Sequence, residues 1–189
     1  MEIDIKQKKI SIADKYQIFV DGKQTYTAST KLFRLLSEIH LLEIGSNNPK
    51  YVIKKRWTLF KPAFDLRWNN NVFEFRTKNF WKHHYYCKVG QDYYEIFGHR
   101  GRKYSIYKNN VQIAYWDKEA ITLYKGDTYK IIADDDCNCE LLISFCLIID
   151  NKSSNNENNH NDALFSTTID FGNIGLQSKK FDPLWLPKK

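Results

Sequence analysis

The sequence shows little of the patterns that direct a protein into or across a membrane. Its first residues, MEIDIKQKK, have no charged, apolar and small-residue regions in succession, so we expect no secretory signal. The longest uncharged apolar run, 141–149, is far shorter than the roughly 18 residues of a spanning helix, so we expect no transmembrane span. Its four cysteines are then expected to be free thiols in a reducing cytoplasm.

The motifs of common catalytic and metal sites are also missing. The sequence contains no G-x-S-x-G, P-loop, G-x-G-x-x-G or H-E-x-x-H pattern. His83 and His84 point to opposite faces of any strand, and neither they nor Cys87 have a second Cys or His cluster at a zinc-like spacing. Cys137 and Cys139 are too closely spaced for a zinc knuckle. We therefore expect a non-enzyme with no catalytic residues, no cofactor and no metal.

What the chain does have is large rings in short alternating segments. Aromatic residues make up 15% of the chain, so the burial of rings provides much of its core. The turn signal Asp21-Gly22 joins two alternating runs into a predicted hairpin. Strands are predicted at 2–9, 15–20, 23–30, 32–36, 38–44, 50–56, 63–68, 72–77, 84–89, 92–98, 103–108, 111–116 and 127–133. Many short strands at close spacing indicate an all-β sandwich or barrel.

The most apolar stretch, CELLISFCLIID at 139–150, is interpreted as a buried helix. Asn138, the aspartates 134–136 and Glu140 are residues that a helix N-terminus favours, and we attribute the three aspartates to helix capping. The apolar side chains that follow cover every direction of a helical wheel, as in a helix buried on all sides. A fully buried strand remains an alternative, because three of these residues are β-branched isoleucines. A barrel is the obvious architecture that encloses a single helix.

An Asn-rich segment, NKSSNNENNHND at 151–162, is predicted to be a flexible linker, because it contains almost nothing to bury. It separates a body, 1–150, from a tail, 163–189. The tail ends in FDPLWLPKK, whose prolines oppose regular structure. Docking of this tail on the body and docking on a partner both remain open.

Residues 1–150 resemble the LURP-one-related family of the tubby C-terminal-like superfamily, which also includes phospholipid scramblases. The resemblance rests on YVIKKRWTLFKPAFDL, KNFWKHHYY, ITLYKGDTYKI and CELLISFCLIID in this order. It implies a mainly β fold, a closed antiparallel barrel of about twelve strands wrapped around a buried C-terminal apolar helix at 137–150. It further implies a binding or scaffolding module. Tubby proteins as a class bind phosphoinositides, but none of their ligand positions can be transferred to this chain.

The charge of the chain indicates where a ligand would bind. Lysine and arginine exceed acidic residues by enough to give a net charge of +7, which favours anionic partners. Lysine provides a point charge and arginine a planar fork for phosphate, so we predict a headgroup site at Lys54, Arg56, Arg100, Arg102 and Lys103. The predicted partner is an anionic lipid surface, bound peripherally from the cytoplasm.

Three other interpretations remain beside this site. The basic residues can form an ordinary solvated surface. A scramblase-like lipid-handling protein would require the apolar helix to leave the barrel, which its length disfavours. A nucleic-acid-binding β module ranks lower, because strand alternation turns many tyrosines inward and no RNP-like motif is present.

Overall fold

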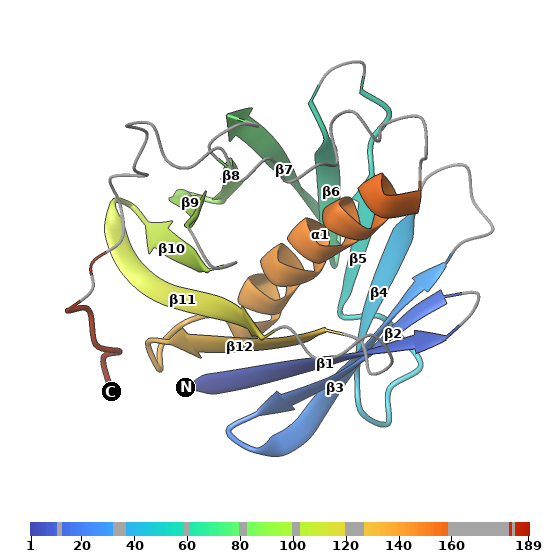
Figure 1. The fold of residues 1–189 in the computed structure, drawn as a ribbon, viewed down its shortest axis with the longest axis horizontal. Helices are drawn as coiled ribbons and strands as arrows, with labels where there is room; N and C mark the ends of the chain where they lie inside the picture. Colours follow the sequence, from blue (N-terminus) through green and yellow to red (C-terminus); the bar gives the residue numbers. More distant parts are fainter. Residues whose placement is uncertain are drawn as a thin grey trace.

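In the described part of the chain, twelve antiparallel strands close into one barrel around one helix (Figure 1). The computed structural model describes residues 1–10, 13–31, 37–58, 61–79, 83–99, 103–119, 127–158, 182 and 184–189. The strands are β1 (Glu2–Ile10), β2 (Ala13–Val20), β3 (Lys23–Lys31), β4 (Glu38–Glu43), β5 (Tyr51–Lys55), β6 (Ala63–Trp68), β7 (Asn71–Asn79), β8 (His84–Val89), β9 (Asp92–Gly98), β10 (Tyr104–Lys108), β11 (Val111–Glu119) and β12 (Thr128–Ala133). The helix, α1, spans Cys139–Asn158. The predicted mainly β barrel with a C-terminal helix is confirmed.

The strands follow one another around the barrel in chain order. Each pairs with the next, and β1 closes the ring by pairing with β12, so these strands leave no open sheet edge. Buried and exposed side chains alternate along the strands as predicted. Where β1 pairs with β12, for example, Ile3 and Ile131 are opposite each other and both are buried. The observed strands agree with the predicted ones within a few residues, and the strand predicted at 32–36 lies outside the described residues.

The two ends of the barrel differ in their connections. At the turn end, two-residue turns join β2 to β3, β6 to β7, β8 to β9 and β10 to β11, and residues 44–50 join β4 to β5. Positive φ angles at these tight turns fall on residue types that tolerate them: Asp21, Gly22, Asn69, Gly90, Asn109 and Asn110. At the loop end, two residues, 11–12, connect β1 to β2, and longer segments connect the other strands: 32–37, 56–62, 80–83, 99–103 and 120–127. Binding residues are more often found on longer loops, so the loop end is the first place to look for them.

Helix α1 begins at the turn end with a side-chain cap. The backbone N–H of Leu141 donates to Oδ1 of Asn138 at 2.8 Å, the geometry of an N-cap. The capping role predicted for the aspartates is wrong for two of them. Asp134 Oδ1 accepts the backbone N–H of Lys188 at 2.7 Å, and Asp135 forms an ion pair with the amino group of Met1. Asp134 and Asp135 thus bind the two ends of the chain, near Lys188 and at Met1, which come close to them only in the folded barrel.

The apolar part of α1 fills the barrel. Its buried side chains are Leu141, Leu142, Ile143, Phe145, Cys146, Leu147, Ile148 and Ile149. The ring of Phe145 lies 5.6 Å from that of Phe75 and 5.7 Å from that of Tyr94, measured between centroids. Figure 1 shows the helix crossing the interior from the turn end to the loop end. Of the two interpretations of this segment, the buried helix is therefore correct.

No helix within the described residues is long and apolar enough to cross a membrane.

The bounds of the helix differ from the prediction. Helix 137–150 was expected to give way to a flexible linker at 151–162, but α1 starts at Cys139 and continues to Asn158. Residues 151–158 are thus helical, because extending a helix that tertiary packing has already formed costs only a few tenths of a kcal/mol per Asn or Ser. Asn151 is also buried, and its Oδ1 accepts the hydroxyl of Ser37 at 3.1 Å. Residues 159–162 lie outside the described part.

A polar contact that alternation did not predict lies near the loop end. Asp150 is buried and accepts the hydroxyl of Tyr16 at 2.7 Å and that of Tyr129. Burial and the charge of Asp150 both raise the pKa of Tyr129, so this phenol stays protonated and keeps donating. Two strands on either side of β1 are thereby connected to the helix.

Candidate functional site

The predicted headgroup residues that can be placed lie at the loop end. Lys54 is the second-to-last residue of β5, Arg56 follows that strand, and Lys103 directly precedes β10. Arg100 and Arg102 lie outside the described residues. Because β6 to β9 separate β5 from β10 around the barrel, the structure brings the three described residues to one end but not into one cluster.

Two of these three cations have carboxylate partners. Arg56 contacts Asp65 at 3.6 Å and pairs with Glu74, which also accepts Arg76. The hydrogen bond from Arg76 and then that from Arg56 lower the pKa of the Glu74 carboxyl, against the opposing effect of burial.

Lys103 is the second paired cation, since its Nζ lies 3.2 Å from Asp117. Lys54 stands between Glu38 and Asp65 in the register of the sheet. The charge available to a ligand at these positions is therefore smaller than the sequence implied.

Among the described residues of the loop end, Trp57 is the most exposed aromatic residue, with 82% of its surface exposed. It follows Lys54, Lys55 and Arg56 in the sequence and precedes the exposed Lys61. Among the described residues, the other exposed large hydrophobic side chains belong to the turn end or the C-terminal segment: Ile44, Val72, Val111, Leu184 and Leu186. Trp57 thus presents a large ring to water, and rings of this kind are enriched at interfaces that have one apolar and one wet side.

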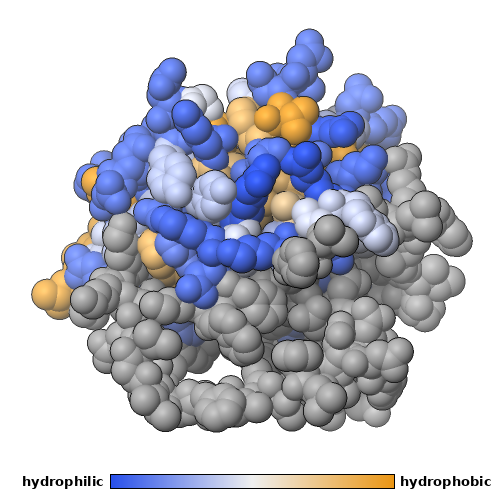
Figure 2. Space-filling model, turned by 90° about the horizontal axis from the view of Figure 1, so that it is seen from above, coloured by the Kyte–Doolittle hydropathy of each residue, from blue (hydrophilic) through white to orange (hydrophobic). Residues whose placement is uncertain are grey.

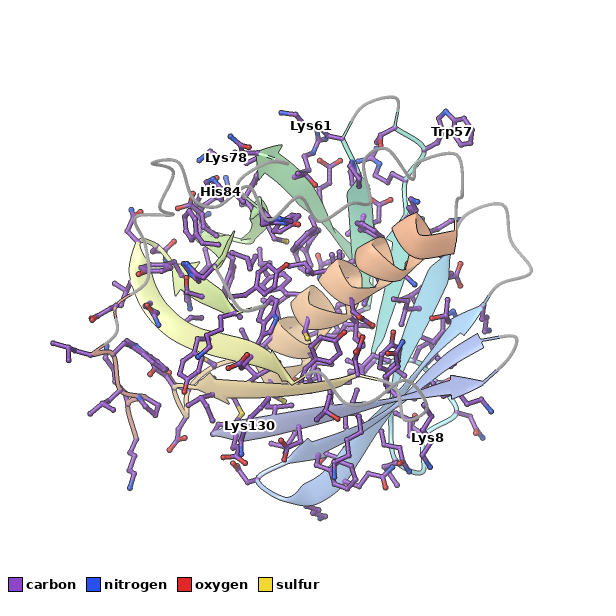
Figure 3. The ribbon with its side chains drawn as sticks, in the orientation of Figure 1. Lys8, Trp57, Lys61, Lys78, His84 and Lys130 are labelled. Atoms are coloured by element: carbon purple, nitrogen blue, oxygen red, sulfur yellow. The ribbon has the colours of Figure 1, made fainter. Side chains whose placement is uncertain are left out.

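Lysine side chains extend this surface towards β7. Lys61 Nζ donates to the backbone oxygen of Lys78 at 3.2 Å, and Figure 3 shows both side chains on the side of the barrel that carries Trp57. Viewed from above that side, the described surface is mostly hydrophilic, with hydrophobic residues in small areas (Figure 2). Trp57, Lys61 and Lys78, with Lys54, Lys55 and Arg56, are called the loop-end surface below.

Both ends of the barrel carry charges of both signs. Described basic residues at or next to strand ends on the loop end include Lys31, Lys54, Lys55, Arg56, Lys61, Lys78 and Lys103. Three of them pair with carboxylates: Arg56 with Asp65 and Glu74, Lys78 with Glu95, and Lys103 with Asp117. The turn end carries the carboxylates of Asp21, Glu43, Asp92, Asp134, Asp135, Asp136 and Glu140 beside the lysines Lys23, Lys50, Lys108 and Lys188. Lys50 pairs there with Glu140 at 3.5 Å.

The two histidines lie in different surroundings. His83 is exposed, whereas the ring of His84 stacks on Phe97 at 4.3 Å and its Nε2 lies 3.0 Å from the buried carboxylate of Glu95. The same carboxylate pairs with Lys78 at 3.3 Å. Glu95 therefore holds the ammonium group of one lysine of the loop-end surface, an ion pair that strand alternation alone did not reveal.

One described group of side chains has metal-ligand chemistry, the trio Asp134, Asp136 and Cys137 at the turn end. Burial and the nearby carboxylates raise the pKa of the Cys137 thiol to about 11, so sulfur is held as the thiol rather than the thiolate that metals prefer. Asp134 already accepts the N–H of Lys188. The donor set is thus poorly suited to a cation.

The tyrosines proposed as a base-stacking platform are divided between the two faces of the sheet. Tyr85, Tyr94 and Tyr107 are buried, while Tyr86 and Tyr93 pack against each other with ring centroids 5.8 Å apart. Rings turned into the core or onto one another do not form a continuous platform for single-stranded nucleic acid.

Comparison with curated proteins and with solved structures finds no significant match. A family model described as LURP-one-related matches residues 1–150. The match covers the whole barrel and the apolar part of α1, and the closed barrel is consistent with the tubby C-terminal-like superfamily. The chain belongs to the LURP-one-related family.

Proposed function

We propose that the chain is a non-enzymatic binding module whose loop-end surface docks on anionic phospholipid headgroups. The observation that carries this proposal is the exposed ring of Trp57, which follows Lys54, Lys55 and Arg56 in the sequence and lies on the same side as Lys61 and Lys78 of a barrel whose interior is filled. A filled barrel offers ligands its outer surface only, and the ring and the cations of this surface suit a wet interface with negative charge.

The expected strength of this contact follows from its charges. Each lysine or arginine close to an anionic membrane contributes about 1 kcal/mol, and a tryptophan at the headgroup level adds the burial of its ring. Arg56 contributes less than the lysines, because Asp65 and Glu74 already neutralise it. The binding is therefore reversible, peripheral and weakened by salt.

The other candidate functions receive less support. A scramblase-like role would require the apolar segment of α1 to leave an interior in which its side chains are buried on every side. Nucleic-acid binding would use the same cations, but the tyrosines are mostly packed in the core or against each other.

Vesicle flotation with the full chain tests the proposal. We expect binding to vesicles of phosphatidylcholine mixed with phosphatidylserine, no binding to phosphatidylcholine alone, and loss of binding between about 50 and 300 mM salt. Lys61→Glu reverses one exposed charge and should weaken binding at least about tenfold. The matched control is Lys23→Glu, an exposed lysine at the turn end, which should bind as the wild type does.

Tryptophan fluorescence tests the position of the ring. Vesicle binding should shift the emission to shorter wavelength, and Trp57→Ala should abolish that shift and weaken binding. Absence of vesicle binding at low salt would exclude the proposed function. Tighter binding to single-stranded nucleic acid than to vesicles, lost in Lys61→Glu, would support the nucleic-acid module instead.

A further inference from the structure

The last residues of the chain lie against the turn end of the barrel. Residue 182 and residues 184–189 contact β11 and the segment that leads from β12 into α1. Figure 1 shows the C-terminus close to the N-terminus, on the side where α1 begins. This site is at the opposite end from the loop-end surface and does not depend on the function proposed for that surface.

Trp185 provides the first anchor. Its indole Nε1–H donates to the backbone oxygen of Gln112 at 2.8 Å, and its ring meets Tyr115 edge to face with centroids 5.9 Å apart. Gln112 is buried, and its side-chain Oε1 accepts the backbone N–H of Asp182 at 3.1 Å. Gln112 therefore accepts two hydrogen bonds from the segment, one at its backbone oxygen and one at its side-chain Oε1.

Lys188 provides the second anchor. Its backbone N–H donates to Oδ1 of the buried Asp134 at 2.7 Å, and its backbone oxygen accepts the N–H of Asp135 at 3.0 Å. The N–H and the C=O of Lys188 are therefore both engaged, which fixes the backbone of this residue on the barrel. The carboxylates of Asp134 and Asp135 on the barrel also favour positive charge on a ligand near the position of Lys188.

Two side chains of the segment take no part in this recognition. Leu184 is 86% exposed and Leu186 80% exposed, so both point away from the barrel on either side of Trp185. The printed contacts therefore come from one aromatic side chain, Trp185, and from the backbones of Asp182 and Lys188; a basic side chain at Lys188 is favoured by the nearby carboxylates only through its charge.

The segment is tethered rather than continuous with the barrel. Helix α1 starts at the turn end and ends at the loop end with Asn158, whereas the backbone N–H of Asp182 contacts Gln112 at the turn end. Because residues 182–189 belong to the same chain as the barrel, their docking is intramolecular, with an effective concentration on the order of 1 mM or less. Docking of this kind competes with free ligands of similar chemistry.

We propose that the turn end is a peptide-binding site, formed by Gln112, Tyr115, Asp134 and Asp135, in which residues 182–189 are the resident ligand. Its external ligand is an extended peptide with a tryptophan followed three positions later by a lysine or arginine. Such a peptide enters when the tail is released, so the tail controls access to the site.

A labelled peptide of residues 180–189 tests the site. In the full chain carrying Trp185→Ala the tethered competitor is weakened, so the peptide should bind at least about tenfold more tightly than it binds the wild type. The same peptide with alanine in place of its tryptophan should not bind. Leu184→Ala, which changes an exposed residue of the tail, is the matched control and should behave as the wild type does.

A second tail variant and a charge reversal on the barrel test the site independently of Trp185. Lys188→Pro removes the N–H that Asp134 accepts, at a position outside the barrel, and should open the site to the peptide as Trp185→Ala does. Adding Asp136→Lys to either variant should weaken the basic peptide several-fold. If the wild type is a dimer that Trp185→Ala converts to a monomer, the resident segment comes from a second copy, and the site is supported.

Two results would overturn the proposal. One is absence of peptide binding to both opened variants at concentrations on the order of 1 mM, because docking by a tether then would not occur either. The other is equal binding to the wild type and the opened variants, since the peptide would then occupy a different surface.

Discussion

Removal of the Phe145 ring should reveal how much of the barrel's stability depends on the enclosed helix. Phe145 is fully buried and its ring lies between those of Phe75 and Tyr94. Truncation of a buried phenylalanine to alanine costs about 3–5 kcal/mol through lost burial and the cavity that remains. Since domains unfold at a cost of about 5–15 kcal/mol, Phe145→Ala should remove a large share of the total.

Chemical and thermal denaturation followed by circular dichroism measures this loss. For a chain of this size, 1 kcal/mol corresponds to about 2–4 °C, so the unfolding midpoint should fall by about 6–20 °C. Phe145→Leu should lose less, because the smaller volume change leaves a smaller cavity. The control, Val111→Ala, truncates a half-exposed residue and should change the free energy of unfolding by about 0.5 kcal/mol or less.

Phe145→Asp should prevent folding altogether, because an unpaired charge would replace a ring in the centre of the barrel. A soluble Phe145→Ala protein with an unchanged midpoint would refute the reasoning. The helix would then be an accessory to a barrel that is stable without it.

Three further predictions concern single contacts. Asn138→Ala removes the acceptor of the Leu141 N–H and should lower the free energy of unfolding by about 0.5–2 kcal/mol in urea titrations, whereas Asn138→Ser should retain most of it. Burial lowers the pKa of His99 below 6.5, so the stability that its neutral form provides is complete above that pH and is lost as the pH falls; His99→Gln should flatten this dependence in melts between about pH 7 and 5. Equal slopes for both proteins would contradict that assignment. Burial raises the pKa of the Cys87 thiol to about 12, so a thiol reagent at neutral pH should label Cys87 in urea but not in the native chain, and rapid native labelling would show the site to be open.

The two candidate sites lie at opposite ends of one rigid barrel. Docking of the loop-end surface on a membrane would direct the turn end, with the resident tail segment, away from the lipid. Binding of lipid at one end and of peptide at the other is therefore sterically compatible. Ternary binding of vesicles and labelled peptide by Trp185→Ala, compared with each ligand alone, would measure any coupling between them.

Local patterns determined most of the architecture. Alternation located the strands from β1 to β12 that are described, since a strand with one face in the core repeats every two residues. Asp21-Gly22 and Asn109-Asn110 are typical hairpin turns, because their tight geometry requires positive φ angles that few residue types accept. The apolar run and Asn138 located the helix, whose burial on all sides already required an enclosing shell.

Other features depended on residues that only folding brings together. The predicted linker became helix as far as Asn158, because tertiary packing supports residues with poor helical propensity of their own. The basic cluster around Arg56 lost part of its free charge to Asp65 and Glu74, carboxylates that are distant in the sequence. Conversely, the exposure of Trp57 could not be inferred, since an aromatic residue in a loop is as readily buried as exposed.

The sequence by itself therefore determined the class of the fold, the strands and the helix that the barrel encloses, because these follow from periodicity and turn chemistry within short windows. The tertiary structure alone decided which charges remain available at the loop end and where Trp185 and Lys188 rest at the turn end. Those outcomes depend on which distant carboxylates, rings and carbonyl groups closure of the barrel places beside them.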